Sequence, residues 1–306
     1  MANRLFRRDH PILLGLIILA GLCLLFLGGI TYFFSILSGP AASDHLFSKK
    51  TGIGIVELKG LILSPEKIIE TISDFRHNPA VKAIVLRVDS PGGAVGASQE
   101  IFTELKRANK IKPVVASMGS LAASGGYYAA LGAERILASP GTLTGSISVI
   151  FKFADLGELF GKIGYKNQVV KSGKLKDVGS SHRPMTEEER RMLQELVDKV
   201  HEQFVAAISE NRSLPVEEVK RLADGRIISG QQAKALGLVD EFGNFIDAVM
   251  LAAKLAGIED EKPRLIYPQN KDFSLLKLLV GEQNATSLNR VMVDIPFLSY
   301  EWTGIQ

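Results

Sequence analysis

The feature of this sequence that most constrains its fold is a repeated order of apolar strand, loop and helix in the first half. Val81 to Val88 has the sequence VKAIVLRV, a β-branched and mostly apolar run typical of a strand buried on both faces of a parallel sheet. Pro113 to Ser117 is a second apolar strand, and a helical stretch at about 98–109 separates the two. This order predicts an α/β fold with a mostly parallel sheet, with ligand-binding loops at the carboxyl ends of its strands. Further along, Thr186 and Glu189 form a capping box that predicts the start of a long helix.

The amino-terminal part contains a long apolar run. Ile12 to Leu37 carries no charged residue, and as a helix it would be about 39 Å long, enough to cross a hydrocarbon core of about 30 Å. Three arginines precede the run, which favours a cytoplasmic amino terminus. We therefore expect a cytoplasmic segment at 1–11, a transmembrane anchor at 12–37, a linker at 38–51 and an extracytoplasmic domain after it.

Two other interpretations of the amino terminus stay open. Cys23, the only cysteine, would carry the lipid of a lipoprotein, although the bulky Leu22 before it disfavours lipid attachment. A signal peptide cleaved near residues 40–42 agrees less well with the length of the run, because the apolar region of a signal peptide has about 7–15 residues.

Charge and composition exclude several classes of function. The net charge is +3 at pH 7, and most of it lies in the first ten residues. A nearly neutral domain is a poor candidate for binding nucleic acid. The sequence also has no cluster of metal ligands and no phosphate-binding loop, so we expect no cofactor and no metal site.

The first segment that could take part in chemistry is Ser90-Pro91-Gly92-Gly93, directly after the Val81–Val88 strand. The two glycines allow backbone N–H groups to approach a ligand and to stabilise the oxyanion of an acyl-transfer intermediate. Taken alone, the segment would more simply be a tight turn.

The second segment offers a nucleophile. Ser124 lies between small residues at the start of a helix, whose positive end favours an oxyanion, and Gly125 and the glycine after it keep the hydroxyl accessible. The alternative role of Ser124 is a helix cap. Ser117 and Ser120 are rival nucleophiles, but no pair of glycines follows either of them.

The third segment, from Lys171 to Val178, offers a base. Of the five histidines only His182 is near a plausible site, and we see no acid placed to pair with it. A lysine can replace histidine if burial lowers its pKa from about 10.4 to near neutral. Lys174 and Lys176 are both candidates, and the alternative is that these lysines form a solvated basic patch.

Taken together and in this order, the motifs resemble the signal peptide peptidase A family in its short, single-repeat form. They are SPGG, SMGSLAASGGYY, LTGSISV, KSGKLKD and GRIISGQQAKALGLVDEFG, and the resemblance runs from about residue 52 to 256. It implies a Ser–Lys dyad with Ser124 as nucleophile and Lys176 as general base. It also implies that Ser146 orients the lysine, and that amides of Gly92 or Gly93 and of Gly125 form the oxyanion hole.

The resemblance also carries expectations for the whole protein. It implies a Clp protease/crotonase-like ββα-superhelix at 52–258 followed by a carboxy-terminal extension at 259–306. It implies a ring-like homo-oligomer, an octamer being one candidate, whose sites take serine and lysine from neighbouring subunits. The expected substrates are apolar peptides, including signal peptides, and the expected location is the bacterial cytoplasmic membrane, with a single pass.

Three alternatives in function remain. One is a related membrane serine protease of the same superfamily with a different target. Another is a crotonase-type acyl-CoA enzyme, which would use a similar oxyanion hole but would need neither the Ser124–Lys176 pair nor an anchor. The third is an inactive protease that serves as a scaffold, against which the intact pair argues.

Overall fold

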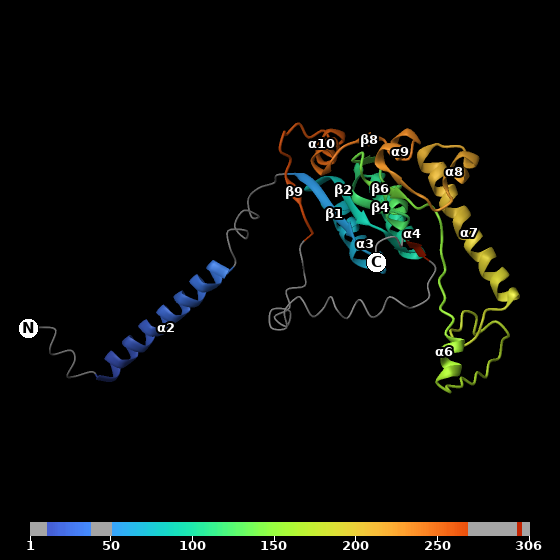
Figure 1. Cartoon of the computed structure of the whole chain (residues 1–306). Coiled ribbons are helices and arrows are strands. Elements are labelled where there is room, and N and C mark those ends of the chain that lie inside the picture. The colour runs from blue at the N-terminus through green and yellow to red at the C-terminus, as the bar shows by residue number, and fades with distance from the viewer. Residues whose placement is uncertain (1–10, 38–50, 269–298, 302–306) are drawn as a thin grey trace, which may run out of the picture. The chain divides into compact units, whose positions relative to one another are not determined.

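The computed structural model describes residues 11–37, 51–268 and 299–301, which are drawn in colour in Figure 1. The chain divides into two units, residues 1–50 and residues 51–306. Nearly all of the predicted cytoplasmic segment and of the linker, and most of the carboxy-terminal extension, lie outside the described residues.

The first unit contains one described element, the helix α2 (Pro11–Leu37). Its side chains are described from residue 18 to residue 32, and the larger apolar ones among them are exposed. Among the described residues, no helix has both the length and the apolar character that a membrane span requires.

The second unit alternates strands and helices, as the sequence predicts. Its elements are β1 (Gly52–Lys59), α3 (Glu66–His77), β2 (Val81–Ser90), β3 (Gly92–Ala94), α4 (Val95–Asn109), β4 (Val114–Ala123), α5 (Gly125–Ala130), β5 (Arg135–Ala138), β6 (Leu143–Gly145), α6 (Gly157–Lys162), α7 (Glu187–Arg212), α8 (Val216–Leu222), β7 (Ile227–Ser229), α9 (Gly230–Ala235), β8 (Glu241–Phe242), α10 (Phe245–Leu255), β9 (Leu265–Ile266) and β10 (Ser299–Glu301).

The central sheet has eight strands and is mostly parallel, which confirms the predicted α/β class. Its main order is β7-β6-β4-β2-β1-β9, with β5 pairing β4 and β8 pairing β5. The pairing of β6 with β7 is the antiparallel exception within this sheet. A separate two-stranded sheet joins β3 to β10 in antiparallel register.

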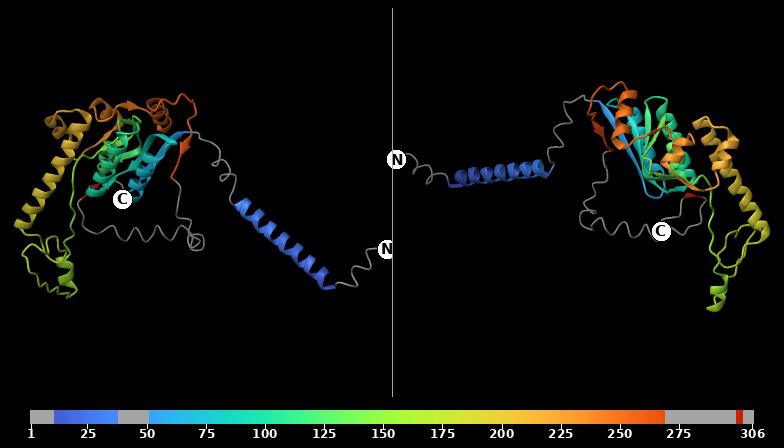
Figure 2. Two further views of the ribbon diagram at one scale, coloured as in Figure 1. Left: turned by 180° about the vertical axis from the view of Figure 1, so that it is seen from behind. Right: turned by 45° about the horizontal axis from the view of Figure 1, so that its top comes forward.

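Helices cover both faces of the sheet, because successive strand side chains point to opposite sides. Ile84 and Leu86 of β2 belong to a large core that includes buried side chains of α3, α4, α5 and α7. Ala83 and Val85, which alternate with them in sequence, pack in a second core with the small buried residues of α10. The views in Figures 1 and 2 agree in placing α10 on the opposite face from α3 and α4.

The strand β4 corrects one expectation. The apolar pattern predicted a strand that ends at Ser117 and a loop from there to Ser124, whereas the strand continues to Ala123. Its final residues pair with β6, with Leu121 opposite Leu143 and Ala123 opposite Gly145. Backbone pairing with a neighbouring strand therefore outweighs the loop-like composition of this segment.

Residues 152–186 form a long excursion that we call the arm. It contains the short helix α6 and no strand, and α7 leads from it back to the sheet (Figures 1 and 2). The predicted capping box at the start of α7 is confirmed: the Thr186 hydroxyl accepts from the Glu189 amide at 3.3 Å, and the Glu189 carboxylate accepts from the Thr186 amide at 2.8 Å. This box fixes the point at which the arm ends.

Candidate active site

Ser124 connects the end of β4 to the start of α5 in a strained conformation. Its φ of 52° and ψ of −117° are rare for a residue with a side chain. Two backbone bonds hold it there, because its N–H donates to the Gly145 carbonyl at 2.8 Å and its own carbonyl accepts from the Tyr128 N–H at 2.8 Å. The sheet and the helix thus fix the direction of this side chain.

The Ser124 hydroxyl is left free by this arrangement. The residue is 1% exposed, and its Oγ has no hydrogen-bond partner among the described residues. Ser124 stands at the N-cap position of α5, but its side chain makes no capping bond, so the role of a helix cap is not the one it performs. A buried, unpaired hydroxyl is costly for stability and is a frequent sign of a functional group.

The three glycines predicted to form an oxyanion hole come together beside Ser124. A Cβ atom on Gly92, whose φ is 101°, would lie 2.7 Å from the amide nitrogen of Gly125. A Cβ atom on Gly125 would lie 3.2 Å from the amide nitrogen of Gly93 and would collide with the Ser98 hydroxyl. Only glycine leaves room for these backbones to approach each other.

Ser90 braces the turn that carries these glycines. Its hydroxyl donates to the Gly60 carbonyl at 2.6 Å and accepts from the Gly92 N–H at 3.1 Å. The Gly92 carbonyl in turn accepts from the Ile62 N–H at 2.8 Å, which leaves the Gly93 amide on the side of Gly125. The backbone beside Ser124 is therefore rigidly held.

Ser146 directly follows Gly145, whose carbonyl accepts the backbone hydrogen bond from Ser124. It follows β6 directly, is buried, and has a positive φ of 49°. Its N–H donates to the Arg226 carbonyl at 2.8 Å, while the preceding Gly145 accepts from the Ser124 N–H. The structure thus brings Ser146 and Ser124 to neighbouring strand ends of one sheet.

Lys176 is not brought to Ser124 within one chain. It lies in the arm, is exposed, and its ammonium group has no hydrogen bond or ion pair with any residue that the structure describes. The first turn of α7, where the arm ends, is separated from Phe204 of the same helix by about 22 Å along the axis. His182, the rival base, stacks on Phe160 of the arm with ring centroids 4.6 Å apart.

A strand that the sequence pattern did not predict lies beside the glycines. β10, near the end of the chain, pairs antiparallel with β3, with Tyr300 opposite Gly93. On its other side, Ser299 exchanges two backbone hydrogen bonds with Ile150, each of 3.1 Å. An extended segment of the chain is thus bound from both sides in a groove next to Ser124.

The side chain of Tyr300 fills an aromatic pocket at this groove. It is fully buried, stacks on Tyr128 at 5.3 Å and contacts the ring of Phe204 at 4.7 Å. Its hydroxyl donates to the Val200 carbonyl at 3.2 Å, and burial raises the pKa of Tyr300. The Tyr300 carbonyl oxygen lies 3.1 Å from where a Cβ of Gly125 would be, next to the clustered amides.

Comparison with known proteins identifies the family. Residues 106–259 match the sequence description of peptidase family S49. A candidate protease of Synechocystis sp., slr0021, is 43% identical over 223 residues, which cover 71% of this chain and 79% of that protein. The chain belongs to peptidase family S49. It is therefore a serine peptidase, and the resemblance found in the motifs is confirmed.

Two further comparisons describe what this S49 peptidase is similar to. A candidate signal peptide peptidase, SppA, of Enterococcus faecium is 37% identical over 185 residues, covering 60% of this chain and 54% of that protein. The chain thus spans about half the length of that relative. A point mutant of ClpP1 from Listeria monocytogenes superposes with a TM-score of 0.44 at 18% identity, covering 64% of this chain and 94% of that one.

Proposed function

We propose that this S49 peptidase is a membrane-anchored serine endopeptidase that cleaves apolar peptides, among them signal peptides left in the membrane. In this proposal Ser124 is the nucleophile and Lys176 the general base. The observation that carries this proposal is the pairing of β10 with β3. An extended segment of the chain itself already lies beside Ser124, whose buried hydroxyl has no hydrogen-bond partner among the described residues.

The position of β10 supports a mode of substrate binding. A substrate strand would add to β3 on one side and to Ile150 on the other, so that main-chain hydrogen bonds supply affinity whatever the sequence. Its side chain at the place of Tyr300 would enter the pocket lined by Tyr128 and Phe204. This pocket favours a large aromatic or apolar residue just before the attacked carbonyl.

The proposed reaction follows from the groups that surround that carbonyl. Lys176 takes the proton of the Ser124 hydroxyl, and the oxygen attacks the peptide carbonyl while the amides of Gly93 and Gly125 stabilise the oxyanion. The lysine returns the proton to the leaving amine. Water then attacks the acyl-enzyme with the same lysine as base, and Ser146 orients the lysine amine.

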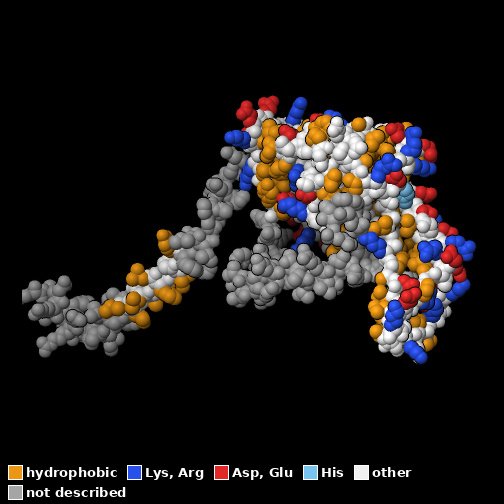
Figure 3. Space-filling model, in the orientation of Figure 1, with side chains coloured by type: hydrophobic (Ala, Val, Ile, Leu, Met, Phe, Trp, Pro, Cys, Tyr) orange, Lys and Arg blue, Asp and Glu red, His pale blue; other side chains and the backbone are white. Residues whose placement is uncertain are grey.

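Assembly is part of the proposal, because one chain lacks a base at Ser124. A neighbouring subunit would supply Lys176 through its arm, in a homo-oligomeric ring. Apolar side chains exposed on the arm support such a contact, as Figure 3 shows for this part of the surface. They are Leu156, Leu159, Ile163, Tyr165, Val169 and Val170.

The membrane anchor is proposed from the sequence alone. The uncharged run Ile12–Leu37 is long enough to cross a bilayer, and the arginines before it favour a cytoplasmic amino terminus. We place the protein in the bacterial cytoplasmic membrane with its peptidase domain outside the cytoplasm. Membership in a peptidase family favours this interpretation over an acyl-CoA enzyme, and the free hydroxyl of Ser124 favours it over an inactive scaffold.

The proposal is tested by labelling the nucleophile. We expect a fluorophosphonate probe to modify the full-length protein in detergent at Ser124, located by mass spectrometry of tryptic peptides. Ser124→Ala should lose labelling and all cleavage of a peptide with tyrosine before the scissile bond. Ser120→Ala, at an exposed position of the same strand, should retain both. Labelling of another serine, or cleavage by Ser124→Ala, would reject Ser124 as the nucleophile.

A further inference from the structure

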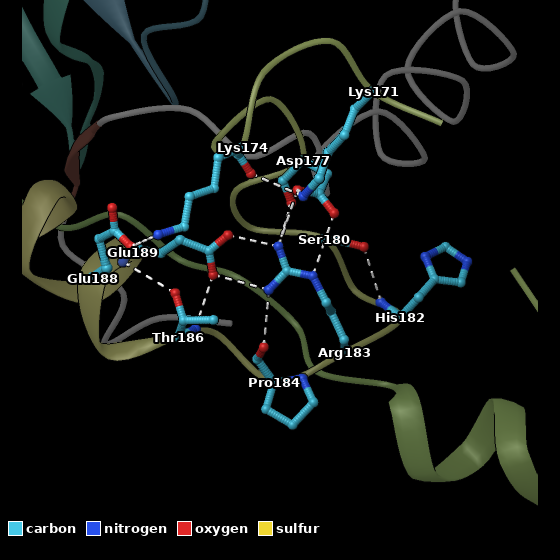
Figure 4. A network of polar contacts seen from close by, with 10 residues as sticks. All are labelled: Lys171, Lys174, Asp177, Ser180, His182, Arg183, Pro184, Thr186, Glu188 and Glu189. Atoms are coloured by element: carbon cyan, nitrogen blue, oxygen red, sulfur yellow. Dashed lines mark hydrogen bonds and ion pairs between the residues drawn. The ribbon is translucent and has the colours of Figure 1, made fainter. Parts of the chain in front are cut away.

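The arm contains a network of charged side chains centred on Arg183, which Figure 4 shows between Asp177 and Glu189. Arg183 donates to both oxygens of Glu189, from Nη2 at 2.6 Å and from Nη1 at 2.9 Å. The guanidinium also contacts Asp177. Its Nη2 lies 3.0 Å from Asp177 Oδ1, and its Nε donates to Asp177 Oδ2 at 3.3 Å. One guanidinium therefore ties two carboxylates together. We call this set of three residues the Arg183 network.

The network joins a loop to the start of a rigid helix. Glu189 belongs to the first turn of α7 and is only 3% exposed, and it also forms the capping box with Thr186. Hydrogen bonds from Arg183 and from the Thr186 backbone hold the pKa of Glu189 at about 2. Arg183, and after it Lys171, lowers the pKa of Asp177. Both carboxylates are therefore charged at neutral pH, and the bonds persist there.

The three lysines of this loop differ in their ion pairs. Lys171 pairs with Asp177 and donates to the carbonyl of Lys174 at 2.9 Å, and Lys174 pairs with Glu188. A carboxylate partner favours the protonated form of a lysine, which makes it a poor base. Lys176 alone of the three has no partner for its ammonium group among the described residues. The loop thus leaves the ammonium group of Lys176 without a carboxylate partner among the described residues.

We propose that Arg183 is a positioning residue for Lys176. It holds Asp177, the residue next to Lys176, against the first turn of α7 and so fixes where the arm presents the lysine. Asp177 and Glu188 form ion pairs with the two neighbouring lysines, Lys171 and Lys174. This inference rests on the proposed role of Lys176 as the base of the peptidase.

The position of α7 explains why the loop with Lys176 must be held against the first turn of this helix. The middle of this helix is buried in the core, where Phe204 contacts Tyr128 of the aromatic pocket, whereas its first turn holds the Arg183 network. A helix of 26 residues is about 39 Å long. Because the helix is rigid, the packing of its middle in the core determines where its first turn lies beside the arm. Without the Arg183 network, the one ion pair between this loop and the first turn of α7 among the described residues would be the exposed pair of Lys174 with Glu188.

The test compares two substitutions of arginine by lysine in the full-length protein. Arg183→Lys keeps the charge but loses the planar fork that reaches both carboxylates. We expect its kcat to fall about tenfold or more, with KM, melting temperature and oligomeric state nearly unchanged, because a small misplacement of a catalytic group is costly. The matched control is Arg212→Lys, which disrupts the two-pronged pair of Arg212 with Asp240 outside the arm and should lower the melting temperature but not kcat.

A second variant separates position from charge. Asp177→Asn removes one negative charge and frees Lys171, so the added positive charge near Lys176 should move the acid limb of the pH–rate profile to lower pH. Arg183→Lys preserves charge and should leave that limb in place. A wild-type kcat in Arg183→Lys, or a fall in kcat that only follows a fall in melting temperature, would overturn the inference. If the wild type itself fails to cleave, it is the proposed function that fails.

Discussion

Lys176→Ala is expected to lower kcat by about 10³-fold, because a serine hydroxyl without a base is a weak nucleophile. Lys174→Ala should stay within a few-fold of the wild type, since Lys174 is engaged by Glu188 at the surface of the arm. The measurement is steady-state cleavage of an apolar fluorogenic peptide by the purified full-length protein. The oligomeric state of each variant should be checked beside it.

His182→Ala is the control that separates the two possible bases. His182 stacks on Phe160 and lies beside Tyr165 in the arm, and we expect its loss to affect packing there and not turnover. A fully active Lys176→Ala, or an inactive but folded His182→Ala, would show that the base is misassigned. The sequence favoured lysine because no acid accompanies this histidine, and in the structure its ring indeed lies among aromatic side chains.

Deleting residues 299–306 should activate the enzyme about tenfold at low substrate concentration. The β10 strand lies in the groove proposed for the substrate, and it is attached to the same chain. A tethered segment has an effective concentration of the order of millimolar, so even a weak affinity of about 0.1 mM would keep the groove filled about nine-tenths of the time. The gain should appear as a lower KM with kcat unchanged, as competition requires.

Adding the strand back tests this explanation. A synthetic peptide with the sequence of residues 297–306 should inhibit the truncated enzyme competitively, and the same peptide with alanine for tyrosine should be weaker, because the pocket beside Tyr128 would stay empty. Ser299→Pro in the full chain should activate partly, since proline cannot donate to the Ile150 carbonyl. A truncated enzyme that is folded but no faster would show that β10 does not compete with substrate.

The parts of the site that lie at strand ends could be predicted from the sequence. A β-branched run followed by Ser90 and two glycines, and a small-residue segment with Ser124 at its end, mark the carboxyl ends of neighbouring parallel strands. Such ends meet at one edge of a sheet, so local pattern alone brings Gly92 near Gly125. The capping box at Thr186 is equally local, and it too was predicted.

The parts that depend on distant pairing could not be predicted. β10 meets β3 across some 200 residues of sequence, and a three-residue strand carries no periodic signal; the alternation of apolar and polar residues in the tail was its only trace. The extension of β4 to Ala123 depends on pairing with β6. The Arg183 network requires the loop to fold back on α7, which spacing alone does not reveal. Nor does local pattern show that one chain keeps Lys176 apart from Ser124.

The central claim is that each site combines Ser124 of one subunit with Lys176 of another, and mixing two inactive variants tests it most directly. Ser124→Ala and Lys176→Ala chains would be co-expressed with different tags, and assemblies that carry both tags would be purified. Random assembly around a ring gives about a quarter of the interfaces an intact serine facing an intact lysine, so we expect about a quarter of wild-type activity. Mixed assemblies that stay as inactive as either variant alone would contradict the claim and place both residues of the site in one chain.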